Sequence, residues 1–147
     1  MRVMQHPPKT LSAGLIVVRR DAQRFRLLCL RAFDSWDFPK VAVHGESDAL
    51  AAALAETRDA TGMDGLELPW GEEARETVPS ADGHVSRYYL AQTRADEVML
   101  RIPPGQYSEE DYEYRWVTYE EAEDILPPRL SLVLDWAANR IAAGPTQ

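Results

Sequence analysis

Two carboxylates three positions apart, Glu56 and Asp59, are the residues of this chain whose spacing most directly suggests chemistry. They fall in an alanine-rich stretch, 47–61, that contains no glycine or proline, which predicts a helix. Residues three apart on a helix share a face, and carboxylate oxygens are the ligands that Mg²⁺ prefers. Taken alone, the pair is better explained as a solvated helix face, because Arg58 lies beside it.

The strongest concentration of charge lies between Ser108 and Asp124. This stretch has eight acidic residues and one arginine, whereas the whole chain of 147 residues carries a net charge of −8, so the remainder is nearly neutral. A surface that binds duplex nucleic acid needs clustered lysine and arginine, so the composition argues against such a partner. Within the stretch, Glu109, Glu110 and Asp111 are possible metal ligands, and the other acids are typical of solvated strand and helix surface.

Other features restrict the class of protein. The three histidines at 6, 44 and 84 are far apart, which argues against a histidine metal site, and Cys29 is the only cysteine, so no intramolecular disulfide can form. No apolar run reaches the roughly 18 residues of a membrane span, and the first residues lack the apolar centre of a signal peptide. We expect a cytoplasmic protein that does not enter the membrane.

Short apolar and β-branched runs predict the strands that would position these side chains. The expected strands are Leu11–Arg20 and Phe25–Arg31, forming a hairpin, followed by Arg75–Val78, Val85–Gln92 and Tyr112–Thr118. Side chains alternate along a strand, so of Tyr88 and Tyr89 one should point into the core and the other outward.

Helix signals in the sequence predict the rest of the framework. We expect Ser47 to cap the helix 47–61, Gly62 to end it, and an apolar stripe to run along it at positions 50, 54, 57 and 61. Thr118 should cap a short acidic helix, Tyr119–Ile125, and the prolines at 127 and 128 should start a terminal helix. Strands mixed with a few helices predict an α/β or α+β fold, in one domain over 1–147 with 1–10 and 144–147 loose.

Several motifs together resemble the Nudix hydrolase family. Trp-Asp-Phe-Pro-Lys at 36–40 precedes Glu56, Asp59 and the pair Gly62-Met63 at the spacing of the family's box. That box runs Gly, five residues, Glu, seven residues, Arg-Glu, an apolar residue, any residue, Glu-Glu, any residue, Gly, an apolar residue. The resemblance implies an α/β/α sandwich around a mixed sheet, with 47–61 as the box helix, and hydrolysis assisted by Mg²⁺ or Mn²⁺.

The match to the box is incomplete. In the ungapped register, non-matching residues occupy the positions of the first Gly, the first Glu, the Arg and the second paired Glu: they are Val41, Ser47, Ala55 and Ala60. Gly45-Glu46-Ser47 resembles the opening of the helix in many relatives, one residue early, so Glu46 could replace the missing Glu. Asp59 is also one methylene shorter than the Glu it replaces.

Flanking motifs resemble the diadenosine tetraphosphate hydrolase branch. They are Trp-Asp-Phe-Pro-Lys, the strand containing Tyr88-Tyr89-Leu90-Ala91, and the segment 109–117, although Asp111 stands where that branch often has a His. The resemblance implies Glu56 and Glu110 as catalytic residues and metal ligands. It implies further roles for Asp59 and Glu46 as metal ligands, and for Lys40, Tyr88 and His44 as substrate-binding residues.

Two hypotheses of different classes follow. The first is a hydrolase, monomeric or homodimeric, that uses metal-assisted water attack to cleave a pyrophosphate linkage in a nucleoside polyphosphate or diadenosine polyphosphate. The alternative is a catalytically impaired Nudix fold that binds a nucleotide or a protein, because Ala55 and Ala60 replace functional residues of the box.

Overall fold

The structure is a computed structural model that describes residues 10–22, 24–95, 97–105 and 108–146. Within these ranges the strands are β1 (Thr10–Asp21), β2 (Arg24–Ala32), β3 (Ser35–Asp37), β4 (Lys40–Val43), β5 (Ala74–Glu76), β6 (His84–Thr93) and β7 (Tyr112–Val117). The helices are α1 (Ala49–Thr61), α2 (Tyr119–Ile125) and α3 (Ser131–Ala143), with 3₁₀ turns at Glu109–Asp111 and Pro128–Leu130.

Strand β1 is the centre of a mixed sheet. It pairs in parallel with β6 from Thr10 opposite His84 to Arg19 opposite Thr93, and antiparallel with both β2 and β4. Strand β5 continues the sheet beyond β6, and β3 and β7 both pair with β2. The mixed sheet confirms the fold class predicted from the sequence, as does the hairpin of β1 and β2.

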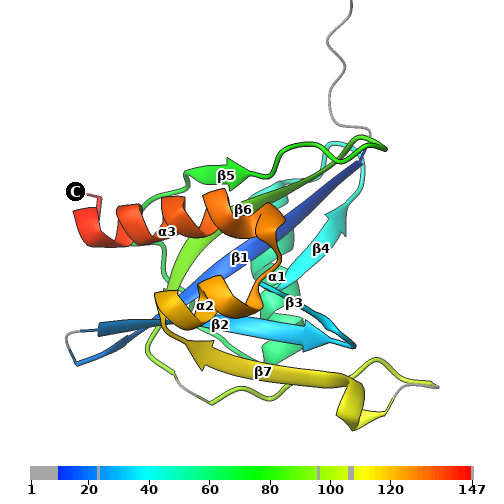
Figure 1. Ribbon diagram of the computed structural model, residues 1–147, viewed down its shortest axis with the longest axis horizontal. Coiled ribbons are helices and arrows are strands. Elements are labelled where there is room, and N and C mark those ends of the chain that lie inside the picture. Colours follow the sequence, from blue (N-terminus) through cyan, green and yellow to red (C-terminus); the bar gives the residue numbers. More distant parts are fainter. Residues whose placement is uncertain (1–9, 23, 96, 106–107, 147) are drawn as a thin grey trace, which may run out of the picture.

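One edge of β1 is shared between two partners, which forks the sheet. Val18–Asp21 pair with β2, whereas Leu11–Gly14 pair with β4, and between these segments the Leu15 amide donates to the Pro39 carbonyl at 3.0 Å. Beyond Leu27, β3 takes the place of β1 beside β2. Figure 1 shows β2 and β4 leaving β1 in different directions.

Helices cover both faces of the sheet, as an α/β/α sandwich requires (Figure 1). Ile16 and Val18 of β1 pack in a core with residues of α2 and α3, whereas Leu15 and Val17 pack in a second core with residues of α1. The alternation of a strand thus serves two buried faces. The prediction that one of Tyr88 and Tyr89 points outward is therefore wrong. The two side chains point to opposite faces of the sheet, and both are buried because helices cover both faces.

The N-cap of helix α1 is one residue later than predicted. Asp48, not Ser47, is its N-cap: the Asp48 carboxylate accepts from the Ala51 amide at 3.2 Å, while the Ser47 hydroxyl donates to the His44 carbonyl. Gly62 ends the helix at φ 74°, as predicted. The buried stripe runs through positions 49, 53, 57 and 61, so the predicted leucines at 50 and 54 lie only half-buried beside it.

The remaining elements follow the sequence closely. Thr118 caps α2, as the sequence predicts, and Glu121 completes a capping box. The short strands β3 and β4 were not predicted. Residues 1–9 and 147 lie outside the described ranges, but Thr10 belongs to β1, and the Thr146 amide donates to the Pro69 carbonyl at 2.7 Å. None of the helices in the described ranges has the length and hydrophobicity that crossing a membrane requires.

Candidate functional site

A cavity of about 390 Å³ lies in the fork between β2 and β4. Its walls come from the end of β2, the segment from β3 to the start of β4, the last turns of α1, the loop around Arg101, and the 3₁₀ turn before α3. Small-molecule sites are typically clefts of about 300–1,000 Å³. The volume is therefore in the range that accommodates a nucleotide-sized ligand.

The charge of the cavity is opposite to that of the whole chain. Among the residues that the structure describes, its lining contains four cationic and two acidic side chains: Arg31, Lys40, Arg101 and Arg129, with Asp37 and Glu56. The formal charge of the lining is therefore +2, in a chain whose net charge is −8. A concave site with an excess of cations attracts an anionic ligand, such as a chain of phosphates.

Asp37 organises one wall of this cavity. Its Oδ2 atom lies 3.0 Å from Lys40 Nζ and accepts a hydrogen bond from Arg129 Nη2 at 2.8 Å. Its Oδ1 atom accepts from the Phe38 amide at 2.7 Å and from the Tyr88 hydroxyl at 2.8 Å. One carboxylate thus fixes two cations from distant parts of the sequence. Lys40 lines the cavity, but Asp37 and Arg129 were not predicted as site residues.

Tyr88 supports this wall from beneath. Its ring is fully buried, contacts Phe38 edge to face at a centroid distance of 5.6 Å, and packs where a Cβ on Gly14 would come within 2.6 Å of it. Burial, together with the nearby Asp37 carboxylate, raises the pKa of Tyr88. The prediction that Tyr88 contacts substrate is therefore wrong for this structure, because no face of the ring is exposed for stacking on a base.

Glu56 of α1 also lines the cavity, together with Ala60 and Arg101. Burial, reinforced by the neighbouring Asp59 carboxylate, raises the pKa of Glu56, and Arg101 partly opposes this shift. Arg101 reaches this part of the lining because its amide donates to the Ala60 carbonyl at 2.8 Å, which ties the loop to the end of α1. A half-buried carboxylate with a raised pKa is a candidate general base.

The acidic donors of the site fit a metal ion only in part. In the described ranges no group of three or more His, Cys, Asp and Glu side chains is arranged to hold one. Glu56 and the exposed Asp59 form a pair of carboxylates on one helix, and Ala60 supplies no ligand. Mg²⁺ commonly binds through one or two carboxylates plus substrate phosphates. The pair suits a cation that arrives with a phosphate ligand.

The other predicted ligands are not among the described residues that line the cavity. His44 and Glu46 are exposed in the loop before α1, and neither is among the described residues that line the cavity. Glu110 is also exposed and outside the lining, although its carbonyl accepts from Arg31 Nη2 at 3.1 Å. Arg31 also bonds to Glu113 at 3.1 Å, so this arginine fixes the acidic turn at the cavity rim.

An aromatic pair lies at the same rim. Tyr112 lines the cavity and contacts Phe33 at a centroid distance of 5.6 Å. Phe33 is 46% exposed and adopts φ 57°, a left-handed conformation that is unusual for a bulky residue. The Phe33 amide donates to the Asp111 carbonyl at 2.6 Å, which holds the turn in place. The pair presents an apolar surface beside the cationic cavity.

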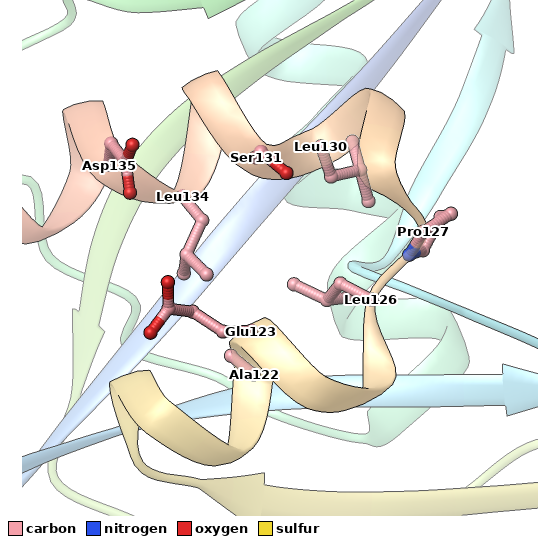
Figure 2. Close-up of a pocket in the computed structure, with 8 residues that line it drawn as sticks. All are labelled: Ala122, Glu123, Leu126, Pro127, Leu130, Ser131, Leu134 and Asp135. Atoms are coloured by element: carbon pink, nitrogen blue, oxygen red, sulfur yellow. The ribbon is translucent and has the colours of Figure 1, made fainter.

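A second hollow is a poorer candidate. Figure 2 shows Leu126 and Leu134 extending into the space between α2 and α3, with Glu123 nearby. This hollow has a volume of about 100 Å³, and its charged lining residues, Glu123 and Asp135, are both acidic. It is too small for a nucleotide, and its charge would repel phosphate.

Comparison with known proteins places the chain in a family. No family model matches it. Mouse bis(5'-nucleosyl)-tetraphosphatase [asymmetrical] is 32% identical over an alignment of 127 residues, which covers 76% of this chain and 80% of that protein. The chain belongs to the Nudix hydrolase family. This confirms the resemblance found in the sequence, including its similarity to the diadenosine tetraphosphate hydrolase branch.

Solved structures of Nudix hydrolases share the fold. The C. elegans Ap4A hydrolase binary complex has a TM-score of 0.72 at 22% identity, over 91% of this chain and 98% of that chain. The NUDIX domain of Shewanella oneidensis NrtR, complexed with ADP ribose, has a TM-score of 0.65 at 12% identity, over 94% of this chain and 90% of that chain. This Nudix hydrolase therefore shares its framework with proteins to which its sequence identity is low.

Proposed function

We propose that this Nudix hydrolase cleaves a pyrophosphate linkage in a nucleoside polyphosphate, with dinucleoside polyphosphates as the preferred class. The observation that supports this proposal most strongly is the cavity: it has an excess of two cations in an acidic chain and faces the half-buried Glu56. The name of the mouse relative points to the same substrate class.

In the proposed reaction Glu56 acts as general base. Its carboxylate takes a proton from a water molecule, the water oxygen bonds to one phosphorus, and the bridging P–O bond breaks. The leaving phosphate departs as an anion beside Lys40 and Arg129, whose charges offset the negative charge that it gains. The raised pKa of Glu56 makes this carboxylate a stronger base than an exposed glutamate.

Mg²⁺ or Mn²⁺ is the proposed cofactor. Glu56 and Asp59 would hold it together with substrate phosphates, and a bound divalent cation offsets phosphate charge and lowers the pKa of water. The aromatic pair Phe33 and Tyr112 replaces Tyr88 as the proposed contact for a nucleobase, because it is exposed at the cavity rim.

Hydrolysis of a substrate panel tests the proposal. Purified protein is incubated with diadenosine tetraphosphate, ATP and ADP ribose, with Mg²⁺ or Mn²⁺, and the products are separated by chromatography. Glu56→Gln should reduce kcat by about 100-fold or more, in the range for loss of a general base, whereas Glu72→Gln, an exposed site outside the cavity lining, should not. Absence of turnover by the wild type on every substrate would reject the proposal.

A second candidate function is nucleotide binding without efficient catalysis. It is favoured by Ala60 in the cavity lining, because the family's box has a glutamate at this position in the ungapped register. In this structure Arg101 is near Ala60 instead. Tight binding of diadenosine tetraphosphate with no detectable hydrolysis would select this function over the first.

A further inference from the structure

We propose that Arg129 and Lys40, held side by side by Asp37, form a binding site for a phosphate chain that works without a divalent metal ion. The proposal deepens the proposed function and rests on it for the identity of the ligand. Its new elements are the role of Arg129, which lies outside the family motifs recognised in the sequence, and the independence from metal.

The geometry of the Asp37 cluster supplies the cations. Lys40 Nζ and Arg129 Nη2 lie 3.0 and 2.8 Å from the same oxygen, Asp37 Oδ2. One carboxylate carries a single negative charge, so the three groups together keep a net charge of +1. Arg129 also contacts the Tyr88 hydroxyl, and the other N–H donors of the lysine and arginine belong to side chains that are 30% and 44% exposed and line the cavity. They are available to an anion that enters it.

The backbone around Arg129 fixes its position. The residue lies in the 3₁₀ turn Pro128–Leu130, and the neighbouring Leu130 is fully buried in the core against α2 and α3. Pro127 and Pro128 restrict the chain just before it. The arginine is therefore preorganised, and ordering it costs little when a ligand binds.

The other cations of the lining explain why a metal is not required for binding. Metal ions in phosphate sites offset the charge of the ligand, and here protein cations do so: Arg101 lies near Glu56, and the lining as a whole carries +2. Arg31 contributes less, because Glu113 and three backbone carbonyls occupy its donors. The phosphate chain is thus placed in a cavity whose lining carries Arg129, Lys40 and Arg101.

Calorimetric titration of the full chain with inorganic tripolyphosphate in EDTA tests the proposal. The wild type should bind without metal, and Arg129→Gln should weaken binding about tenfold, the loss expected for charge-assisted hydrogen bonds. Lys40→Gln should weaken it similarly, and Arg129→Lys should restore part of the loss because it keeps the charge. Adenosine, which has no phosphate, serves as the ligand control.

Arg87→Gln is the matched control variant. Arg87 is 33% exposed, pairs with Glu76 at 2.7 Å and is not among the described residues that line the cavity. An equal loss of affinity in Arg87→Gln and Arg129→Gln would overturn the proposal, because only the net charge of the protein would then matter. Binding that requires Mg²⁺ in the wild type would overturn it as well. Melting temperatures of all variants show whether each is folded.

Hydrolysis of diadenosine tetraphosphate, measured in parallel with Mg²⁺, separates this proposal from the proposed function. Binding in EDTA without turnover supports the phosphate site and rejects the hydrolase. Turnover without binding in EDTA rejects the metal-independent site and keeps the hydrolase. The two proposals therefore fail in different measurements.

Discussion

Replacing Asp37 by asparagine is the most direct test of the cluster that forms one wall of the cavity. The substitution preserves size and removes one charge. The Asp37 side chain is 16% exposed, so the charge that the substitution removes is largely shielded from water. The Oδ1 atom of an asparagine can still accept hydrogen bonds from the Phe38 amide and the Tyr88 hydroxyl. Its NH₂ group, in place of Oδ2, cannot accept from the two cationic side chains, which also carry only donors.

The size of the effect follows from these contacts. Asp37→Asn removes two ion pairs, and the cationic partners are 30% and 44% exposed, so each pair contributes about 1 kcal/mol instead of the larger value of a buried pair. Weaker hydrogen bonds from Phe38 and Tyr88 add a fraction of this. We expect a loss of about 2–3 kcal/mol in the free energy of unfolding, which for a chain of this length lowers Tm by about 4–12 °C.

Urea denaturation monitored by tryptophan fluorescence measures this loss. Asp34→Asn, at an exposed position in the turn between β2 and β3, is the control and should change stability by less than about 0.5 kcal/mol. In an Arg129→Gln background the cost of Asp37→Asn should fall by about 1 kcal/mol, because one of its two ion pairs is already absent. An unchanged or increased stability of Asp37→Asn would refute the reasoning that Asp37 holds this wall together.

Three further predictions concern Glu56 and Ala60 on α1 and Gly14 on β1. Burial and the Asp59 carboxylate raise the pKa of Glu56, so the folded state loses stability as the pH rises through that pKa. Glu56→Gln should therefore raise Tm at pH 7. Thermal melts should show that this gain in Tm vanishes when the pH is below 4.5, the ordinary pKa of a glutamate. Ala60→Glu should weaken tripolyphosphate binding in EDTA and tighten Mn²⁺ binding, both measured by calorimetry; an unchanged Mn²⁺ affinity would mean that this part of α1 does not face a metal position. Gly14→Ala should destabilise the protein by about 1–3 kcal/mol in urea titrations, because its Cβ would meet the buried Tyr88 ring at 2.6 Å, and wild-type stability would show that the ring can move.

The elements that the sequence predicts well are those with local signals. The hairpin of β1 and β2 and the capping of α2 by Thr118 depend on neighbouring residues, and the structure has both. Strands β3 and β4 have three and four residues, and they exist because β2 and β1 offer free edges to them. Such short strands have no periodicity of their own to recognise.

The candidate site divides in the same way. The motif and helix patterns led to Lys40 and Glu56, which both line the cavity. Asp37 was missed because two of its partners, Tyr88 and Arg129, are 51 and 92 residues away in the sequence. Strand alternation assigned Tyr88 and Tyr89 to opposite faces correctly, but alternation alone does not say which faces a helix will cover.

The fork in the sheet has a consequence for how this protein can change over evolutionary time. The cavity exists because β2 and β4 separate from β1, and because the Pro39 carbonyl accepts a hydrogen bond from the Leu15 amide between them. Both features belong to the backbone. Apart from Asp37, the side chains that face into the cavity are not what separates these two strands. A lineage with this architecture can therefore exchange carboxylates for arginines, and so alter the ligand it accepts, while the folded framework survives each step.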